Sequence, residues 1–165
     1  MPDAVPQSLQ IPLPSEADTS HLGVQLARLL QPGDTVLLEG PIGAGKTHLA
    51  RALIRARLGR AEDVPSPTFT LVQTYVAAGT EIWHADLYRL THPDEVWELG
   101  LDDAFATAIC LVEWPDRLGR HVPEGALRVG LSDLGLSDLR HGRLATLTGG
   151  RSGLLAALRD AQADA

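Results

Sequence analysis

A glycine-rich stretch in the first third of the chain carries the residue types that bind phosphate. Residues 40–47 read Gly-Pro-Ile-Gly-Ala-Gly-Lys-Thr and match the spacing Gly-x4-Gly-Lys-[Ser/Thr] at Gly40, Gly45, Lys46 and Thr47. Glycines in such a loop let backbone N–H groups turn toward phosphate oxygens without interference from a Cβ. The N-terminus of the helix that follows faces the same anion, and the threonine hydroxyl reaches a magnesium ion. The pattern predicts a site for the phosphates of ATP or GTP with Mg²⁺.

We expect nucleotide contacts from the loop and from the start of the following helix, at Gly40, Gly43, Ala44, Gly45, Lys46, Thr47 and His48. Lys46 is the single lysine of the chain, whereas the other thirteen of its fourteen Lys and Arg residues are arginines. For His48 we expect the backbone N–H, not the imidazole, to face the α-phosphate. Trp114 is compatible with a place in the core or over the nucleotide, and composition does not distinguish the two.

Two carboxylates at predicted strand ends are candidates for the acidic partner that such a site needs near its metal. Asp86 ends the segment 81–86, in which alternation places Ile82 and His84 on the same face as Asp86. Glu113 ends the apolar run 110–113, a pattern typical of Walker B strands. A turn residue and a cap before a proline are the simpler explanations of the two carboxylates. The sequence leaves open which of them orients an attacking water.

A polar segment between the first helix after the loop and the next strand carries three hydroxyls, Ser66, Thr68 and Thr70. In a nucleotide-binding protein, this is where a switch segment meets the γ-phosphate or the metal. A polar loop with two prolines explains the same composition equally well. The arginines of the helix, Arg51, Arg55 and Arg57, favour a solvated face over phosphate ligands.

The kind of nucleotide follows from residue types that the chain lacks. Guanine is usually read by an Asn-Lys-x-Asp motif, but the sequence contains no Asn and its single Lys lies in the phosphate loop. ATP is therefore the expected nucleotide. A small-molecule kinase would add an arginine-rich lid, and the only candidate is a short segment with Arg117 and Arg120. An adaptor that binds ATP without hydrolysing it is the third possibility.

The bulk composition is that of an ordinary globular protein. Hydrophobic residues make up 44% and charged residues 21% of the 165 residues, and the formal net charge is −7. No apolar run approaches the roughly 18 residues of a transmembrane helix, and one cysteine cannot form an internal disulfide. We expect a soluble, cytoplasmic protein without a membrane partner. The acidic charge argues against direct binding to nucleic acid, so any such role would run through another protein.

The spacing of apolar residues predicts a single α/β domain over residues 1–165, with residues 1–7 as a flexible tail. Helices are expected from Ser15 to Leu30, after the loop to Gly59, from His92 to Leu99 and from Gly153 to Ala163. Strands are expected at 8–13, 35–39, 69–76, 81–87, 108–113, 126–131 and 143–148. Strand, loop and helix follow one another around residues 40–47, as the phosphate motif requires. The predicted fold is a P-loop NTPase-like three-layer sandwich with a mixed central sheet.

Several segments in this order resemble the bacterial TsaE (YjeE) family, the ATPase of tRNA N6-threonylcarbamoyladenosine biosynthesis. They are the phosphate loop, Ser66-Pro67-Thr68-Phe69-Thr70-Leu71-Val72, Trp83-His84-Ala85-Asp86-Leu87-Tyr88-Arg89-Leu90, Glu98-Leu99-Gly100 and Cys110-Leu111-Val112-Glu113-Trp114-Pro115. The resemblance runs from about Ile11 to the C-terminal helix and weakens after Pro123.

The resemblance implies an ATPase, weak alone, that acts with the proteins TsaB and TsaD and meets tRNA only through that complex. It implies that Thr47 and Glu113 hold Mg²⁺ and that Asp86 serves hydrolysis. It also implies that Thr68 lies in a switch-like loop and that Trp114 lies beside the nucleotide. The catalytic set expected on this basis is Asp86, Glu113, Lys46 and Thr68. The first turn of the first helix, Ser15 to Thr19, is expected near the adenine.

Overall fold

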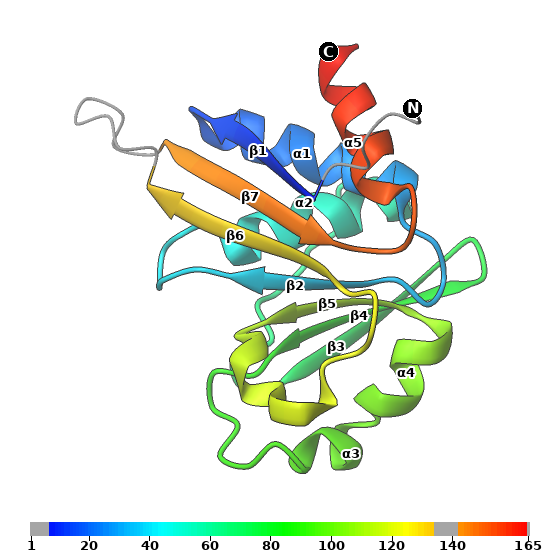
Figure 1. Ribbon diagram of the computed structural model, residues 1–165. Helices are drawn as coiled ribbons and strands as arrows, with labels where there is room; N and C mark the ends of the chain where they lie inside the picture. Colours follow the sequence, from blue (N-terminus) through cyan, green and yellow to red (C-terminus); the bar gives the residue numbers. More distant parts are fainter. Residues whose placement is uncertain (1–6, 134–141, 165) are drawn as a thin grey trace.

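Seven strands form one mixed sheet in the order β1-β7-β6-β2-β5-β4-β3 (Figure 1). The computed structural model describes residues 7–133 and 142–164. The strands are β1 (Ser8–Leu13), β2 (Thr35–Glu39), β3 (Val72–Ala77), β4 (Thr80–Asp86), β5 (Ile109–Glu113), β6 (Leu127–Asp133) and β7 (Arg143–Gly149). The helices are α1 (Glu16–Leu29), α2 (Lys46–Leu58), α3 (Glu95–Leu99), α4 (Leu101–Thr107), α5 (Leu154–Ala163) and a 3-10 segment, η1 (Pro115–His121).

The centre of the sheet is parallel, and its edges are antiparallel. Strands β6, β2, β5 and β4 run in the same direction, while β1 and β7 on one side and β3 on the other pair antiparallel. Strand β5 is buried along its whole length, as expected for a continuous apolar run with layers on both faces. The carboxyl ends of β2, β5 and β4 therefore lie side by side at one end of the parallel strands, where α/β proteins bind their ligands.

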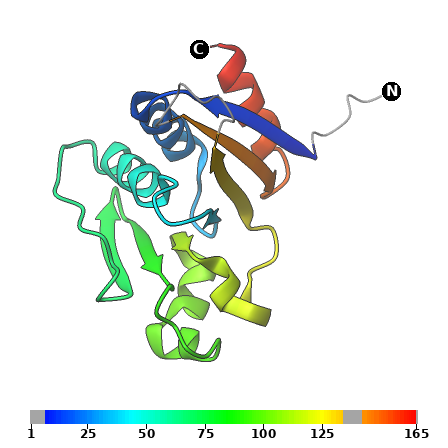
Figure 2. The same cartoon turned by 90° about the vertical axis from the view of Figure 1, so that its left-hand side faces the viewer.

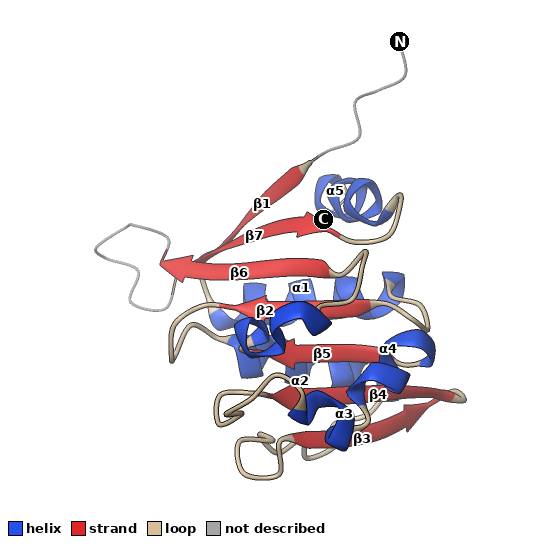
Figure 3. Cartoon of the chain, turned by 60° about the horizontal axis from the view of Figure 1, so that its bottom comes forward, coloured by secondary structure: helices blue, strands red, loops and turns tan. Residues whose placement is uncertain are grey.

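Helices cover both faces of the sheet, which gives three layers (Figures 2 and 3). Side chains alternate between the two cores: Val36 and Leu38 of β2 pack with α1, α2 and α5, whereas Leu37 packs with α3, α4 and η1. Helices α1 and α2 approach closely at Gly23, where an added Cβ would lie 2.8 Å from the Cβ of Ala52. The predicted α/β sandwich with a mixed sheet is confirmed.

Most predicted elements occur within a few residues of the expected bounds, and three differences have physical reasons. Strand β3 begins at Val72 instead of residue 69, because Pro67 to Leu71 form a turn and Leu71 has a positive φ of 68°. Helix α4 was not predicted; it starts directly after Gly100, whose left-handed backbone ends α3. The helix predicted to open at His92 begins only at Glu95, because the preceding residues form a turn.

The tail expected at residues 1–7 lies outside the described residues except for Gln7, and so does most of the connection between β6 and β7. In the part of the chain that is described, no helix combines the length and the apolar character needed to cross a bilayer.

Candidate functional site

The glycine-rich loop joins the central strand β2 to α2 and has a backbone that only glycine adopts readily. Gly40, Gly43 and Gly45 have φ angles of 146°, 81° and 100°. A Cβ on Gly40 would lie 2.7 Å from the carbonyl oxygen of Leu131 on β6, so the loop also needs glycine there for space. Gly45 is the N-cap of α2, and the helix begins at Lys46. The strand–loop–helix arrangement predicted from the motif is confirmed.

Lys46 folds back over its own loop. Its ammonium donates to the carbonyl oxygens of Gly40 at 2.5 Å and Pro41 at 2.9 Å, and lies 4.1 Å from the centre of the Trp114 ring. The residue is 5% exposed. Burial lowers the pKa of Lys46, while the nearby carboxylates of Glu113 and Asp86 raise it in part. The amine is thus held at the loop by acceptors that an anion could replace.

Trp114 is placed over Lys46 by an unusual backbone. It follows β5 directly, has φ 59° and ψ 54°, and precedes Pro115 at the start of η1. A left-handed conformation costs a residue with a Cβ roughly 1–3 kcal/mol, and such strain gathers at functional sites. The indole ring packs at 5.0 Å, centre to centre, on Tyr88. Trp114 therefore lines the cavity and also packs partly against the core, while its contact with a nucleotide stays a prediction.

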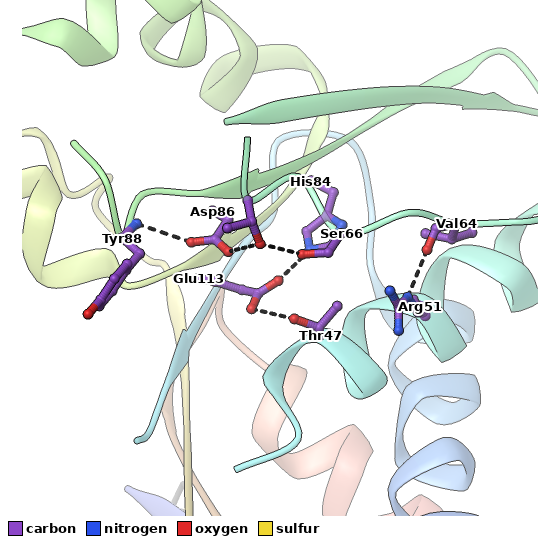
Figure 4. Close-up of polar contacts among 9 residues, drawn as sticks. Thr47, Arg51, Val64, Ser66, His84, Asp86, Tyr88 and Glu113 are labelled. Atoms are coloured by element: carbon purple, nitrogen blue, oxygen red, sulfur yellow. Dashed lines mark hydrogen bonds and ion pairs between the residues drawn. The ribbon is translucent and has the colours of Figure 1, made fainter. Parts of the chain in front are cut away.

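Glu113 lies at the carboxyl end of β5, facing the first turn of α2. Its Oε1 accepts a hydrogen bond from the Thr47 hydroxyl at 2.8 Å, and its Oε2 is 2.7 Å from Nε2 of His84 (Figure 4). The residue is 2% exposed. A carboxylate this buried requires hydrogen-bond donors, and two different elements supply them.

Asp86 lies beside Glu113, because Asp86 and Glu113 are register partners at the ends of the parallel strands β4 and β5. Its Oδ2 accepts from the Thr68 hydroxyl at 3.3 Å, and its Oδ1 from the backbone N–H of Tyr88 at 3.1 Å. Thr68 is in turn hydrogen-bonded to Ser66 at 2.7 Å. This loop, the hydroxyl segment (residues 64–70), is thereby connected to Asp86.

These residues surround one open cavity of about 440 Å³. It is lined by Ile42, Gly43, Ala44, Gly45, Lys46, Thr47, His48, Thr68, Asp86, Tyr88, Glu113 and Trp114. The structure thus brings together all the predicted site residues except Gly40. Gly40 lies behind the loop, where it accepts from Lys46 and lines a second cavity with Trp114. Thr70 is not among the lining residues and instead accepts from Gln73.

The neighbouring arginines and the first helix also take defined places. Arg51, Arg55 and Arg57 do not line the cavity; each donates to backbone carbonyls of nearby segments. Arg51, for example, holds Val64 of the hydroxyl segment at 2.7 Å. The imidazole of His48 lies between Ser20 at 2.8 Å and the carbonyl oxygen of Glu16 at 3.2 Å, which brings the start of α1 to the side of the cavity.

Sequence reasoning missed three residues of this site. Alternation placed His84 on the face of Asp86, but nothing in the sequence paired it with Glu113. Tyr88 follows Asp86 by two residues, a spacing that by itself predicts no contact. Arg143 of β7 donates to the loop carbonyls of Gly43 at 2.9 Å and Ala44 at 3.2 Å from a hundred residues away. Only the strand order brings it there, and the sequence does not specify that order.

The loop, its helix and two carboxylates on neighbouring parallel strands define an α/β protein of the P-loop-like class. Residues 13–140 match the family model described as "Threonylcarbamoyl adenosine biosynthesis protein TsaE". The chain belongs to the TsaE family.

Named relatives agree with that assignment. The chain is 41% identical over 122 residues to the tRNA threonylcarbamoyladenosine biosynthesis protein TsaE of Rickettsia conorii, covering 74% of this chain and 70% of that protein. It is 38% identical over 131 residues to the protein of the same name from Haemophilus influenzae, covering 76% and 82%. The crystal structure of Bacillus subtilis YdiB superposes with a TM-score of 0.74, covering 99% of this chain and 100% of that one, at 23% identity, which supports the fold.

Proposed function

We propose that this protein binds and hydrolyses Mg-ATP as the ATPase component of tRNA N6-threonylcarbamoyladenosine biosynthesis, in a complex with TsaB and TsaD. The names of its relatives supply the pathway. The single observation that carries the chemistry is the meeting of Lys46 and Thr47 with Glu113 and Asp86 in one cavity at the end of the parallel sheet.

Phosphate binding is the first part of the proposal. Backbone N–H groups of the loop and the N-terminus of α2 attract the phosphate oxygens. Lys46 exchanges the carbonyl oxygens of Gly40 and Pro41 for the β- and γ-phosphates, because phosphate adds an attraction between opposite charges that neutral carbonyls lack. Trp114 then covers the phosphate end of the nucleotide, and the first turn of α1 next to His48 lies on the side of the base.

The residues of the cavity fit Mg²⁺. The donors at its inner end are the Thr47 hydroxyl and the carboxylates of Glu113 and Asp86, all hard oxygen ligands of the kind that Mg²⁺ prefers. Among residues 7–133 and 142–164 there is no group of three or more His, Cys, Asp and Glu side chains arranged for a metal. A magnesium ion that arrives with a nucleotide needs only one or two carboxylates, because phosphates and waters complete its shell. Thr47 and Glu113 would hold the ion, which neutralises developing charge on the phosphates.

The two carboxylates have different roles in hydrolysis. Glu113 faces the metal, because it accepts a hydrogen bond from Thr47, the other residue that would hold the ion. Asp86 is bound to Thr68 of the hydroxyl segment, which suits it to orient the attacking water when that segment closes on the γ-phosphate. Phosphoryl transfer is catalysed mainly by positioning and electrostatics, so an isolated site that lacks part of its contacts hydrolyses slowly. TsaB and TsaD supply the missing contacts, and the formal net charge of −7 leaves tRNA binding to them.

The test is phosphate release from Mg-ATP by the purified chain, alone and with TsaB and TsaD. We expect slow release by the chain alone, acceleration in the complex, and loss of both in Lys46→Ala. Arg159→Ala removes a positive charge from α5, outside the cavity, and should behave as wild type.

Other outcomes would contradict the proposal in distinct ways. Transfer of the γ-phosphate to a metabolite, without stimulation by TsaB and TsaD, would identify a small-molecule kinase. Tight ATP binding with no release over hours, equal to a Glu113→Ala blank, would identify a nucleotide-sensing adaptor. In cells, a strain carrying only Lys46→Ala should lose the modified adenosine in its tRNA, and normal modification would exclude a role for ATP binding.

A further inference from the structure

A buried histidine fixes the carboxylate that faces the phosphate loop. His84 lies in the middle of β4, is 0% exposed, and is paired across the sheet with Gln73 of β3 and Leu111 of β5. Its Nε2 lies 2.7 Å from Oε2 of Glu113. Its Nδ1 is also buried and has no hydrogen-bond partner among the described residues. The only polar contact of this imidazole in the described structure is thus the one to Glu113.

The direction of that hydrogen bond follows from the chemistry of the two groups. A carboxylate oxygen accepts and does not donate, so Nε2 carries the hydrogen of this bond. Glu113 then accepts one bond at each oxygen, from His84 on the inside and from Thr47 on the side of the cavity. Both side chains are nearly inaccessible, at 0% and 3% for His84 and Glu113, so water cannot replace the imidazole as donor.

We propose that His84 is a positioning residue: its Nε2–H holds Oε2 of Glu113 so that Oε1 faces Thr47 and the cavity. This inference rests on the proposed hydrolysis of Mg-ATP. When the Thr47 hydroxyl turns toward the metal, Glu113 loses one donor, and His84 is the donor that remains. Without it, Oε2 of Glu113 has no fixed hydrogen-bond donor, and nothing holds Oε1 on the side of the metal. Mutation of a residue that orients a metal-binding carboxylate in this way typically lowers activity or metal affinity 10–100-fold.

The test compares a variant that keeps the donor with one that removes it. His84→Gln places an amide N–H at a reach similar to that of Nε2, whereas His84→Phe keeps a ring without a donor. His121→Gln is the matched control, since Nε2 of His121 also binds a carboxylate oxygen, that of Asp94 at 2.8 Å, but outside the cavity. In the complex with TsaB and TsaD, we expect kcat to fall about 10–100-fold in His84→Phe and KM for Mg-ATP to rise by the affinity that the metal no longer adds. His84→Gln should recover most of kcat, and His121→Gln should match wild type.

A second readout is independent of turnover. Binding of a fluorescent ATP analogue, with and without Mg²⁺, should show equal affinity without the metal and a smaller gain from the metal in His84→Phe. If His84→Phe does not fold, His84→Asn replaces it, because its shorter amide does not reach Glu113.

The failures of the two proposals are distinguishable. Wild-type kcat in His84→Phe, or equal losses of kcat in the Gln and Phe variants, would overturn the positioning role, because packing alone does not distinguish a donor from a non-donor. If the wild-type complex releases no phosphate, the proposed hydrolysis is wrong. The binding measurement then decides on His84 alone, and an unchanged gain from Mg²⁺ in His84→Phe would refute its role.

Discussion

Thr47 joins α2 to β5 in the absence of nucleotide, and replacing it with valine should weaken that connection. Valine has nearly the shape of threonine, so Thr47→Val removes the hydroxyl without opening a cavity. The lost hydrogen bond is 2.8 Å long and ends on a carboxylate that is 2% exposed. Hydrogen bonds to charged groups contribute about 1.5–3 kcal/mol. At about 2–4 °C per kcal/mol for a protein of this size, the melting temperature should fall by roughly 3–12 °C.

The assay is thermal and urea unfolding of the chain without nucleotide, followed by circular dichroism. Thr47→Ser keeps the hydroxyl and serves as the control, so it should remain closer to wild type than Thr47→Val. A double-mutant cycle with Glu113→Ala isolates the contact, because the coupling energy reports the pair and not the packing of either residue. If Thr47→Val is as stable as wild type, or if the cycle gives no coupling, the hydrogen bond from Thr47 to Glu113 does not stabilise the fold.

Three further predictions concern separate parts of the molecule. Ser15→Ala removes the capping box of α1, so the free energy of unfolding should fall by about 0.5–2 kcal/mol, and an unchanged urea midpoint would contradict the cap. Burial raises the pKa of the Cys110 thiol from 9.0 to about 12. The stability that the protein gains from the buried, neutral thiol is therefore full below pH 9 and is lost as the pH rises toward 12. The loss should reach up to about 1.4 kcal/mol per pH unit relative to Cys110→Ala in parallel urea titrations. Equal pH dependence of the unfolding free energy in both proteins would show that the thiol is accessible. Mg-ATP should move Lys46 away from the Trp114 ring and change tryptophan emission, and the same change in Trp114→Phe would show that another tryptophan reports it.

The parts of the site that the sequence predicts are those that local rules determine. The phosphate loop needs glycines at fixed spacing before a helix, and the motif states that requirement directly. Asp86 was found at the end of an alternating segment and Glu113 at the end of an apolar run, and parallel strands place their carboxyl ends together. The helix start expected at Ser15 is also set locally, because the Ser15 side chain caps the first turn of α1.

What the sequence does not predict depends on strand order and on contacts distant along the chain. The strand order places β4 next to β5, which lets His84 reach Glu113. It also brings Arg143 of β7 to the loop carbonyls. Alternation gives the face of a strand but not its neighbour. Helix α4 was missed because a seven-residue helix directly after Gly100 shows too few turns for a periodic pattern.

The most direct test of the central claim is a structure of this protein with Mg²⁺ and a non-hydrolysable ATP analogue. We predict that the triphosphate lies in the loop of residues 43–48 and that the Lys46 ammonium has left the carbonyl oxygens of Gly40 and Pro41 for the β- and γ-phosphates. We also expect Mg²⁺ beside Thr47 and Glu113. A nucleotide bound elsewhere, or a triphosphate in the loop with Lys46 still on Gly40 and Pro41, would contradict this prediction.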